Sequence, residues 1–175
     1  MTERFTHCPV LIVGAGPAGL AVAACLRKKS QDFQIIEQSN QVGWRWHHHY
    51  DRLHLHTARD YSALPHMGFA RGVPRYPSRE QVVEYLQTYA QHFAIEPQFN
   101  TELKSLHRET DHWRVVTSKQ DIQAKQVVLC TGYNGSPNGP ILRRQQSTSR
   151  FIAGIIVTPS QLLGRAIWLL SLIHI

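Results

Sequence analysis

The sequence predicts an α/β fold of three layers, and three observations predict it. Residues 10–13 are an apolar run that leads directly into Gly14, Gly16 and Gly19, which have the spacing G-x-G-x-x-G and precede small, helix-forming residues. A second apolar run at residues 33–37 follows, so the whole has the order of a βαβ unit. Short β-like segments later in the chain add a small antiparallel meander. Together these features predict a Rossmann-like domain that binds FAD or NAD(P).

Each glycine of the turn has its own physical reason. Gly14 permits the tight turn, Gly16 lets a pyrophosphate approach the main chain because it has no Cβ, and Gly19 lets the helix pack closely on the strand. The free N–H groups of the first helical turn would then face the anion. The alternative interpretation is a glycine-rich turn in an unrelated α/β domain.

An acidic residue ends the second strand and narrows the choice of ligand. Glu37 follows Gly19 by 18 residues. A carboxylate at this place accepts hydrogen bonds from a ribose 2′-hydroxyl and repels a 2′-phosphate. The motif therefore predicts an adenine dinucleotide with a free ribose, FAD or NAD, rather than NADP.

The next elements follow in chain order. The first helix is expected from about residue 18 to 29, and residues 38–77 are expected to be irregular, since they show little periodicity. A loop of this length in a compact domain usually carries function. Ser78, followed by acidic residues, predicts the start of a helix. Residues at helical spacing along this helix should face the core: Val82, Val83, Leu86, Tyr89, Ala90 and Phe93.

The second half of the chain contains β-like segments. Three short ones are expected at about residues 101–106, 113–117 and 122–124, and the middle pair is typical of an antiparallel hairpin or meander. A separate buried strand, residues 126–130, then ends in Thr131-Gly132.

Composition limits the class of protein. A chain of 175 residues with 18% charged residues is typical of one globular domain. The formal net charge is +7, but Lys and Arg are spread along the chain and no nucleic-acid-binding signature accompanies them, so no nucleic-acid partner is expected. Three widely spaced cysteines, Cys8, Cys25 and Cys130, indicate reduced thiols and a cytoplasmic protein.

Neither a membrane segment nor a metal site is expected. Acidic Glu3 and the glycine-rich turn are unlike a signal peptide. The apolar residues 151–175 are interrupted by Pro159, Gln161 and Arg165, so they are not expected to span a bilayer. The three adjacent residues at 47–49, all histidine, have no Cys or carboxylate placed to complete a metal site.

Several motifs together resemble one family. GAGPAG at 14–19 resembles the FAD fingerprint of flavoproteins with two dinucleotide-binding domains, and VVLCTG at 127–132 resembles their later V-V-x-A-T-G strand. GWRW at 43–46, YDRLHLH at 50–56, and LP at 64–65 are similar to motifs of the class B flavoprotein monooxygenases, the flavin-containing and YUCCA-like enzymes and their bacterial branch. The resemblance covers about residues 8–140.

The resemblance implies cofactors, substrates and a mechanism. FAD would be a tightly held prosthetic group, with NADPH as reductant and O₂ as oxidant, and a flavin C4a-hydroperoxide would oxygenate a small organic substrate. His56 lies where the flavin-containing enzymes tend to have an Asn beside the flavin, which makes it the candidate catalytic residue; a hydrogen-bonded loop histidine is the alternative. The implied FAD contacts are Gly14, Gly16, Pro17, Ala18, Gly19, Glu37, Gln38, Trp46, Leu55, Thr131 and Gly132.

Three questions stay open at this point. Trp46 would either wall the flavin from solvent or be an ordinary core residue. The function could instead be hydride transfer without oxygenation, or non-catalytic binding of a dinucleotide, although the absence of a C-x-x-C motif around Cys130 argues against the disulfide reductases of the same fold. The substrate could be an indole-pyruvate-like acid, an amine, a sulfide or a ketone, and the oligomeric state is undetermined.

The family pattern ends at about residue 140. Residues 1–140 are therefore expected to be an incomplete FAD-binding domain, and residues 141–175 an aberrant tail without the family's NADPH site, so that the fragment alone would be inactive. Neither a second G-x-G-x-x-G nor the family's F-x-G-x-x-x-H-[ST] follows Pro140. From the third base of the Arg150 codon, degenerate codons for 150–159 can spell Phe-His-Arg-Gly-His-Tyr-Arg-His-Ser, which contains G-x-x-x-H-S. The hypothesis is a shifted reading frame from about residue 141.

Overall fold

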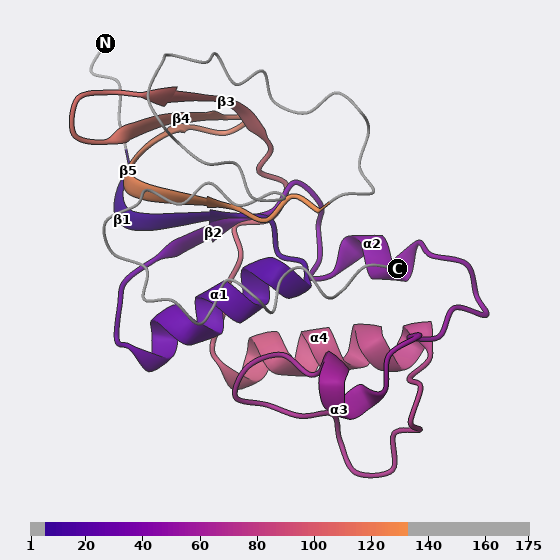
Figure 1. Cartoon of the computed structure of the whole chain (residues 1–175). Coiled ribbons are helices and arrows are strands. Elements are labelled where there is room, and N and C mark those ends of the chain that lie inside the picture. Colours follow the sequence, from indigo (N-terminus) through magenta and orange to yellow (C-terminus); the bar gives the residue numbers. More distant parts are fainter. Residues whose placement is uncertain (1–5, 133–175) are drawn as a thin grey trace.

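A five-stranded sheet forms the middle of the molecule (Figure 1). The computed structural model describes residues 6–132, and the order of the strands is β2-β1-β5-β4-β3. β1 (Thr6–Val13) pairs in parallel with both β2 (Gln34–Ile36) and β5 (Asp121–Leu129). β4 (Trp113–Thr117) pairs antiparallel with β5 and with β3 (Leu103–Arg108). The predicted α/β class with an antiparallel meander is confirmed.

Within residues 6–132, four helices accompany the sheet. α1 (Pro17–Lys28) directly follows the glycine-rich turn, with Pro17 in the first helical turn, where its missing N–H costs nothing. α2 (Trp44–His47) and α3 (Arg59–Ser62) are short. α4 (Arg79–His92) begins with a capping box, because Ser78 accepts from the Gln81 N–H and the Gln81 side chain accepts from the Ser78 N–H. The predicted helix start at Ser78 is confirmed.

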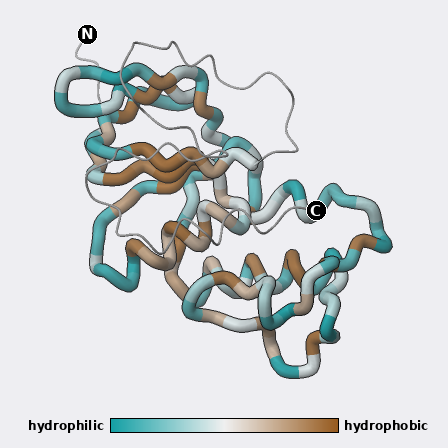
Figure 2. Tube along the Cα trace, in the orientation of Figure 1, coloured by the Kyte–Doolittle hydropathy of each residue, from teal (hydrophilic) through white to brown (hydrophobic). Residues whose placement is uncertain are grey.

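The molecule has three layers. In Figure 1 the hairpin β3–β4 lies over one side of β1 and β5, and α1 and α4 lie on the other side. Alternate residues of β1 serve the two interfaces, since Val10 and Ile12 belong to the cluster shared with the helices and Leu11 and Val13 to the cluster shared with β3 and β4. Figure 2 shows this apolar centre as brown strands surrounded by hydrophilic loops.

Two expectations about secondary structure were wrong. The segments predicted separately at 122–124 and 126–130 form the single strand β5, because exposed Lys125 interrupts the apolar pattern while the main chain continues to pair with β1 on both sides of it. Residues 38–77, expected to be irregular, contain α2 and α3. No helix within residues 6–132 is long and apolar enough to cross a membrane. The predicted boundary at residue 140 and the predicted tail lie outside the described residues.

Candidate cofactor site

The β1–α1 turn is wedged between the ends of two strands. The Gly14 N–H donates to the Ile36 carbonyl of β2 at 2.8 Å, and the Cys130 N–H donates to the Val13 carbonyl at 2.8 Å. Gly14 has φ +109°, and a Cβ there would lie 2.4 Å from the Cys130 carbonyl oxygen. Only glycine therefore fits at position 14, for reasons of both backbone conformation and space.

The other two glycines of the motif differ sharply. A Cβ on Gly19 would lie 1.8 Å from the Gly14 carbonyl oxygen, so this glycine is required for α1 to contact the turn. A Cβ on Gly16 would have no heavy atom within 4 Å apart from its immediate neighbours, and the φ of Gly16 is −82°, which any residue adopts. Nothing in the fold of the described residues requires glycine at position 16. The open space there is what a pyrophosphate needs.

The N-terminus of α1 opens beside Gly16. The Leu20 N–H donates to the Gly16 carbonyl at 3.0 Å. The N–H groups of Ala18 and Gly19 precede this bond, and the first N–H groups of a helix have no partner within the helix. Such groups, together with the helix dipole, attract an anion.

Glu37 joins the turn to the segment that follows β2. Its Oε2 accepts from the Ala15 N–H at 2.7 Å and its Oε1 accepts from the Ser39 N–H at 2.8 Å. Each carboxylate oxygen has a further lone pair, which can accept from a ribose hydroxyl. The sequence predicted only the contact with ribose, and the structural role toward Ala15 is new.

The predicted contact residues fall into two groups. Gly14, Gly16, Glu37 and the exposed pair Thr131-Gly132 meet at the carboxyl ends of β1, β2 and β5, where open α/β sheets bind ligands. Pro17, Ala18 and Gly19 belong to the first turn of α1, next to this edge, and Gln38 is exposed beside Glu37.

The second group lies on the segment after β2. Gly43, with φ +65°, precedes α2 and donates its N–H to the Ala15 carbonyl at 3.0 Å, which ties this segment to the β1–α1 turn. Trp46 and Leu55 are each 6% exposed and belong to the helix-side core. His56 is exposed, and its imidazole makes no hydrogen bond with residues 6–132. Contact of these three side chains with FAD stays a prediction.

The sequence analysis missed the residues that hold the segment 63–69. The Tyr85 hydroxyl accepts from the Leu64 N–H at 2.8 Å and donates to the Met67 carbonyl at 2.6 Å, and the Tyr89 hydroxyl donates to the Pro65 carbonyl at 2.7 Å. Burial raises the pKa of both tyrosines, so the hydroxyls stay neutral donors. The helical spacing of Tyr89 predicts that its side chain faces the core. The sequence carries no signal for which loop carbonyl its hydroxyl group reaches.

The thiols of the described residues are buried or half-buried, and Cys25 Sγ lies 3.9 Å from His66 Nε2. Burial raises the pKa of Cys8 to about 11 and that of Cys130 to about 12, and it also raises the pKa of Cys25, so all three free thiols are protonated at neutral pH. His48 stacks on Trp44. Among residues 6–132, no three His, Cys, Asp or Glu side chains are grouped so that they could share a metal ion.

The geometry at the sheet edge fits an adenine dinucleotide. Open space at Gly16 and the free N–H groups of α1 suit the pyrophosphate, and the Glu37 carboxylate suits a ribose. These features do not distinguish FAD from NAD by themselves.

Comparison with known proteins supplies the family. The pyridine nucleotide-disulphide oxidoreductase family matches residues 11–150, which includes the first ten residues of the predicted tail. Indole-3-pyruvate monooxygenase YUCCA6 of Arabidopsis thaliana is 36% identical over 167 residues, which cover 90% of this chain and 39% of that protein. The chain thus spans about two fifths of the length of such relatives.

Solved structures agree on the fold. The bacillithiol disulfide reductase Bdr of Staphylococcus aureus has a TM-score of 0.69 at 21% identity, over 74% of this chain and 39% of that chain. The flavin-containing monooxygenase of Stenotrophomonas maltophilia has a TM-score of 0.66 at 24% identity, over 70% of this chain and 38% of that chain. Among structures of the same fold, a steroid monooxygenase has been solved with NADP and OTEMO with FAD and NADP, the cofactors that the resemblance implies for the family.

The motifs at 14–19 and 50–56 resemble those of the class B flavoprotein monooxygenases. The relatives found by sequence and by fold confirm this resemblance. The family match covers most of the 175 residues. The chain belongs to the pyridine nucleotide-disulphide oxidoreductase family.

Proposed function

We propose that this chain supplies the FAD-binding part of a cytoplasmic, NADPH-driven monooxygenase that transfers one oxygen atom of O₂ to a small organic substrate. The observation that carries the proposal is the open space at Gly16, next to the N-terminus of α1 and the Glu37 carboxylate. The similarity to YUCCA6 and to flavin-containing monooxygenases favours oxygenation over other reactions of this fold.

The residues at the sheet edge have separate tasks in this proposal. The N–H groups of Ala18 and Gly19 bind the pyrophosphate of FAD, and Glu37 accepts from its ribose. Thr131 and Gly132 approach the cofactor from the end of β5. The bound flavin would supply O₂ activation: two electrons from NADPH reduce one oxygen atom to water while the other enters the substrate.

Helix α2 and the segment that follows it complete the proposed site. Trp46 and Leu55 are buried apolar side chains that would exclude water from a bound flavin, and His56 would supply a hydrogen-bond donor beside it. His56 is exposed within the described residues, as a group that meets a cofactor must be before binding.

FAD binding by the whole chain is the first test. Titration with FAD, followed by quenching of flavin fluorescence, should give saturable binding to the wild type. Gly16→Ala should lower FAD affinity at least about tenfold, because the new Cβ occupies space beside the pyrophosphate. Gly68→Ala is the matched control, since a Cβ there also has nothing within 4 Å and Gly68 lies outside the proposed site. Equal affinities of the two variants would refute the assignment of the pyrophosphate site.

The reaction class needs a second test, on a longer protein. A protein that extends over the length of the relatives should consume O₂ with NADPH and incorporate ¹⁸O from labelled O₂ into its product. NADPH oxidation with an added acceptor but without ¹⁸O incorporation would favour plain hydride transfer. FAD binding without NADPH oxidation would favour a dinucleotide-binding module.

The proposed domain boundary is tested on the DNA. We propose that residues 1–140 are the FAD-binding domain and that the reading frame changes near residue 141. Sequencing from the codon for Pro140 onward should show a frame that restores the G-x-x-x-H-S motif and a second G-x-G-x-x-G. If no one-base shift restores both, the frame-shift hypothesis is wrong.

A further inference from the structure

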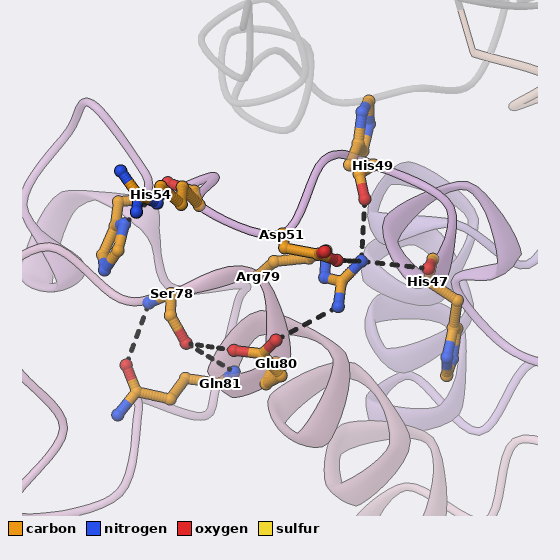
Figure 3. A network of polar contacts seen from close by, with 9 residues as sticks. His47, His49, Asp51, His54, Ser78, Arg79, Glu80 and Gln81 are labelled. Carbon is orange, nitrogen blue, oxygen red and sulfur yellow. Dashed lines mark hydrogen bonds and ion pairs between the residues drawn. The ribbon is translucent and has the colours of Figure 1, made fainter.

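Arg79, the first residue of α4, bonds to alternate residues of the segment 47–53. Its Nη1 donates to the His49 carbonyl at 2.7 Å and to the His47 carbonyl at 3.5 Å, and it pairs with the Asp51 carboxylate at 3.0 Å (Figure 3). Its main-chain N–H donates to the Leu53 carbonyl at 2.8 Å. One residue thus contacts four groups spaced two residues apart, which ties this segment, with its turn at residues 50–53, to the start of α4.

Main-chain pairing continues this contact toward His56. The Leu55 N–H donates to the Pro77 carbonyl at 2.9 Å, and His54 forms an antiparallel bridge with Ser78. The Arg79 side chain is 19% exposed, so its charge lies in a partly desolvated setting. Hydrogen bonds from a charged donor are stronger there than in water.

The ion pair with Asp51 contributes little to this contact. Asp51 is 91% exposed, and exposed ion pairs are worth little because solvent screens them. The two carbonyl contacts matter more, because they fix the main chain itself. His47 ends α2, and a guanidinium beside the last carbonyls of a helix is favourably placed.

Helix stability alone does not account for an arginine at this position. A positive charge in the first turn of a helix opposes the helix dipole, and acidic residues are favoured there instead. Glu80 offsets part of this cost by accepting from the Arg79 Nη2 at 3.1 Å. Arg79 therefore stabilises the segment 47–53 that it contacts rather than α4, the helix to which it belongs.

We propose that Arg79 is a positioning residue of the flavin site. The segment that it holds begins just after Trp46 and ends just before Leu55 and His56, the three residues proposed to line the flavin. Arg79 fixes the separation and orientation of these two ends, so its loss leaves FAD bound by the glycine turn but loosely surrounded on the flavin side. This inference rests on the proposed function.

The test compares Arg79→Met with Arg71→Met in the whole chain. Arg71 is an exposed arginine outside the network and serves as the matched control. The Arg79→Met variant should bind FAD about tenfold more weakly, because the His47 and His49 carbonyls lose their charged donor and the flavin side of the site loosens. It should also raise the fluorescence of bound flavin and blur its visible absorption bands, because the flavin ring becomes accessible to water. Arg71→Met should match the wild type in both measurements.

Arg79→Lys keeps the charge and separates positioning from folding. Because lysine keeps the positive charge, this variant should have the urea midpoint of the wild type. A lysine lacks the planar guanidinium and cannot donate to several acceptors at once, so the variant should not have the wild-type flavin spectrum. Flavin spectra of Arg79→Met and Arg79→Lys that equal the wild-type spectrum would overturn the proposal, and so would a weakening of FAD binding that only follows the loss of folded protein. If the wild type itself binds no FAD, the proposed function fails instead, and the two failures are distinguishable.

Discussion

The β1–α1–β2 unit and the segment 38–77 lie side by side but are held in different ways. Main-chain hydrogen bonds between neighbouring elements hold the first, such as that from Gly14 to Ile36, along with close approaches that only glycine permits. The second also has main-chain bonds, such as that from Leu55 to Pro77, but much of it is held by three side chains of α4, namely Arg79, Tyr85 and Tyr89. A structure fixed by main-chain contacts within a short motif can be inferred from that motif. A segment held in part by side chains 18 to 32 residues later cannot.

The largest loss of stability in the β1–α1–β2 unit is expected from a substitution at Gly19. The change Gly19→Ala should destabilise the protein by about 3 kcal/mol or more, because its Cβ would lie 1.8 Å from the Gly14 carbonyl oxygen and the main chain must move. Urea unfolding followed by tryptophan fluorescence measures the loss. Gly16→Ala is the control and should cost about 1 kcal/mol or less, since its Cβ meets nothing. Equal costs would contradict the separation of a folding glycine from a ligand glycine.

For the segment 38–77, the largest loss of stability is expected from a substitution at Tyr85. Tyr85→Phe removes one hydrogen bond to the Met67 carbonyl and another from the buried Leu64 N–H, so it should cost about 2 kcal/mol. Tyr89→Phe removes the single bond to the Pro65 carbonyl and should cost about 1 kcal/mol. The two urea midpoints and limited proteolysis within residues 63–69 test this order. A larger loss from Tyr89→Phe would show that the segment depends on other contacts.

These two regions also mark what the sequence could predict. The strands at residues 10–13 and 113–117, the capped start of α4 and the glycine turn all follow from short patterns of apolar period, capping and spacing. The single strand β5 was missed because Lys125 breaks its apolar pattern, although the main chain pairs with β1 on both sides of this residue. The spacing of apolar residues shows which side chains face the core, but it does not show where the main chain of a strand pairs with its neighbour.

Some residues of the candidate site could also be predicted from the sequence, and others could not. Gly16 and Glu37 were identified from the motif, and the structure brings them together at the sheet edge. The bond from Ala15 to Glu37 and the contacts of Arg79 with His47 and His49 join residues 22 to 32 positions apart. No spacing rule in a single sequence carries such information. The roles of Trp46 and His56 stay predictions.

A smaller effect is expected at Cys130, beside the glycine turn. Burial raises the pKa of its thiol to about 12, so the side chain acts as a small neutral group. Cys130→Ala should therefore cost only about 1 kcal/mol and leave FAD affinity unchanged. Urea unfolding and FAD titration check both statements. Loss of flavin binding or reduction would instead indicate a thiol role, as in a disulfide reductase.

The smallest effect is expected where α4 meets the second region, at Glu80. Hydrogen bonds from Arg79 and Ser78 hold the pKa of the Glu80 carboxyl below its ordinary value. A depressed pKa in the folded state gives stability that is present above the ordinary carboxyl pKa, about 4.3, and is lost as the pH falls through the lowered value. The wild type should thus exceed Glu80→Gln slightly in urea midpoint at neutral pH, and the difference should shrink in acid and vanish once the pH lies below the lowered pKa of the Glu80 carboxyl. Because Glu80 is exposed, added salt should shrink the difference as well. A difference that persists in acid would mean that the amide disturbs the Ser78 cap and that charge pairing with Arg79 contributes nothing.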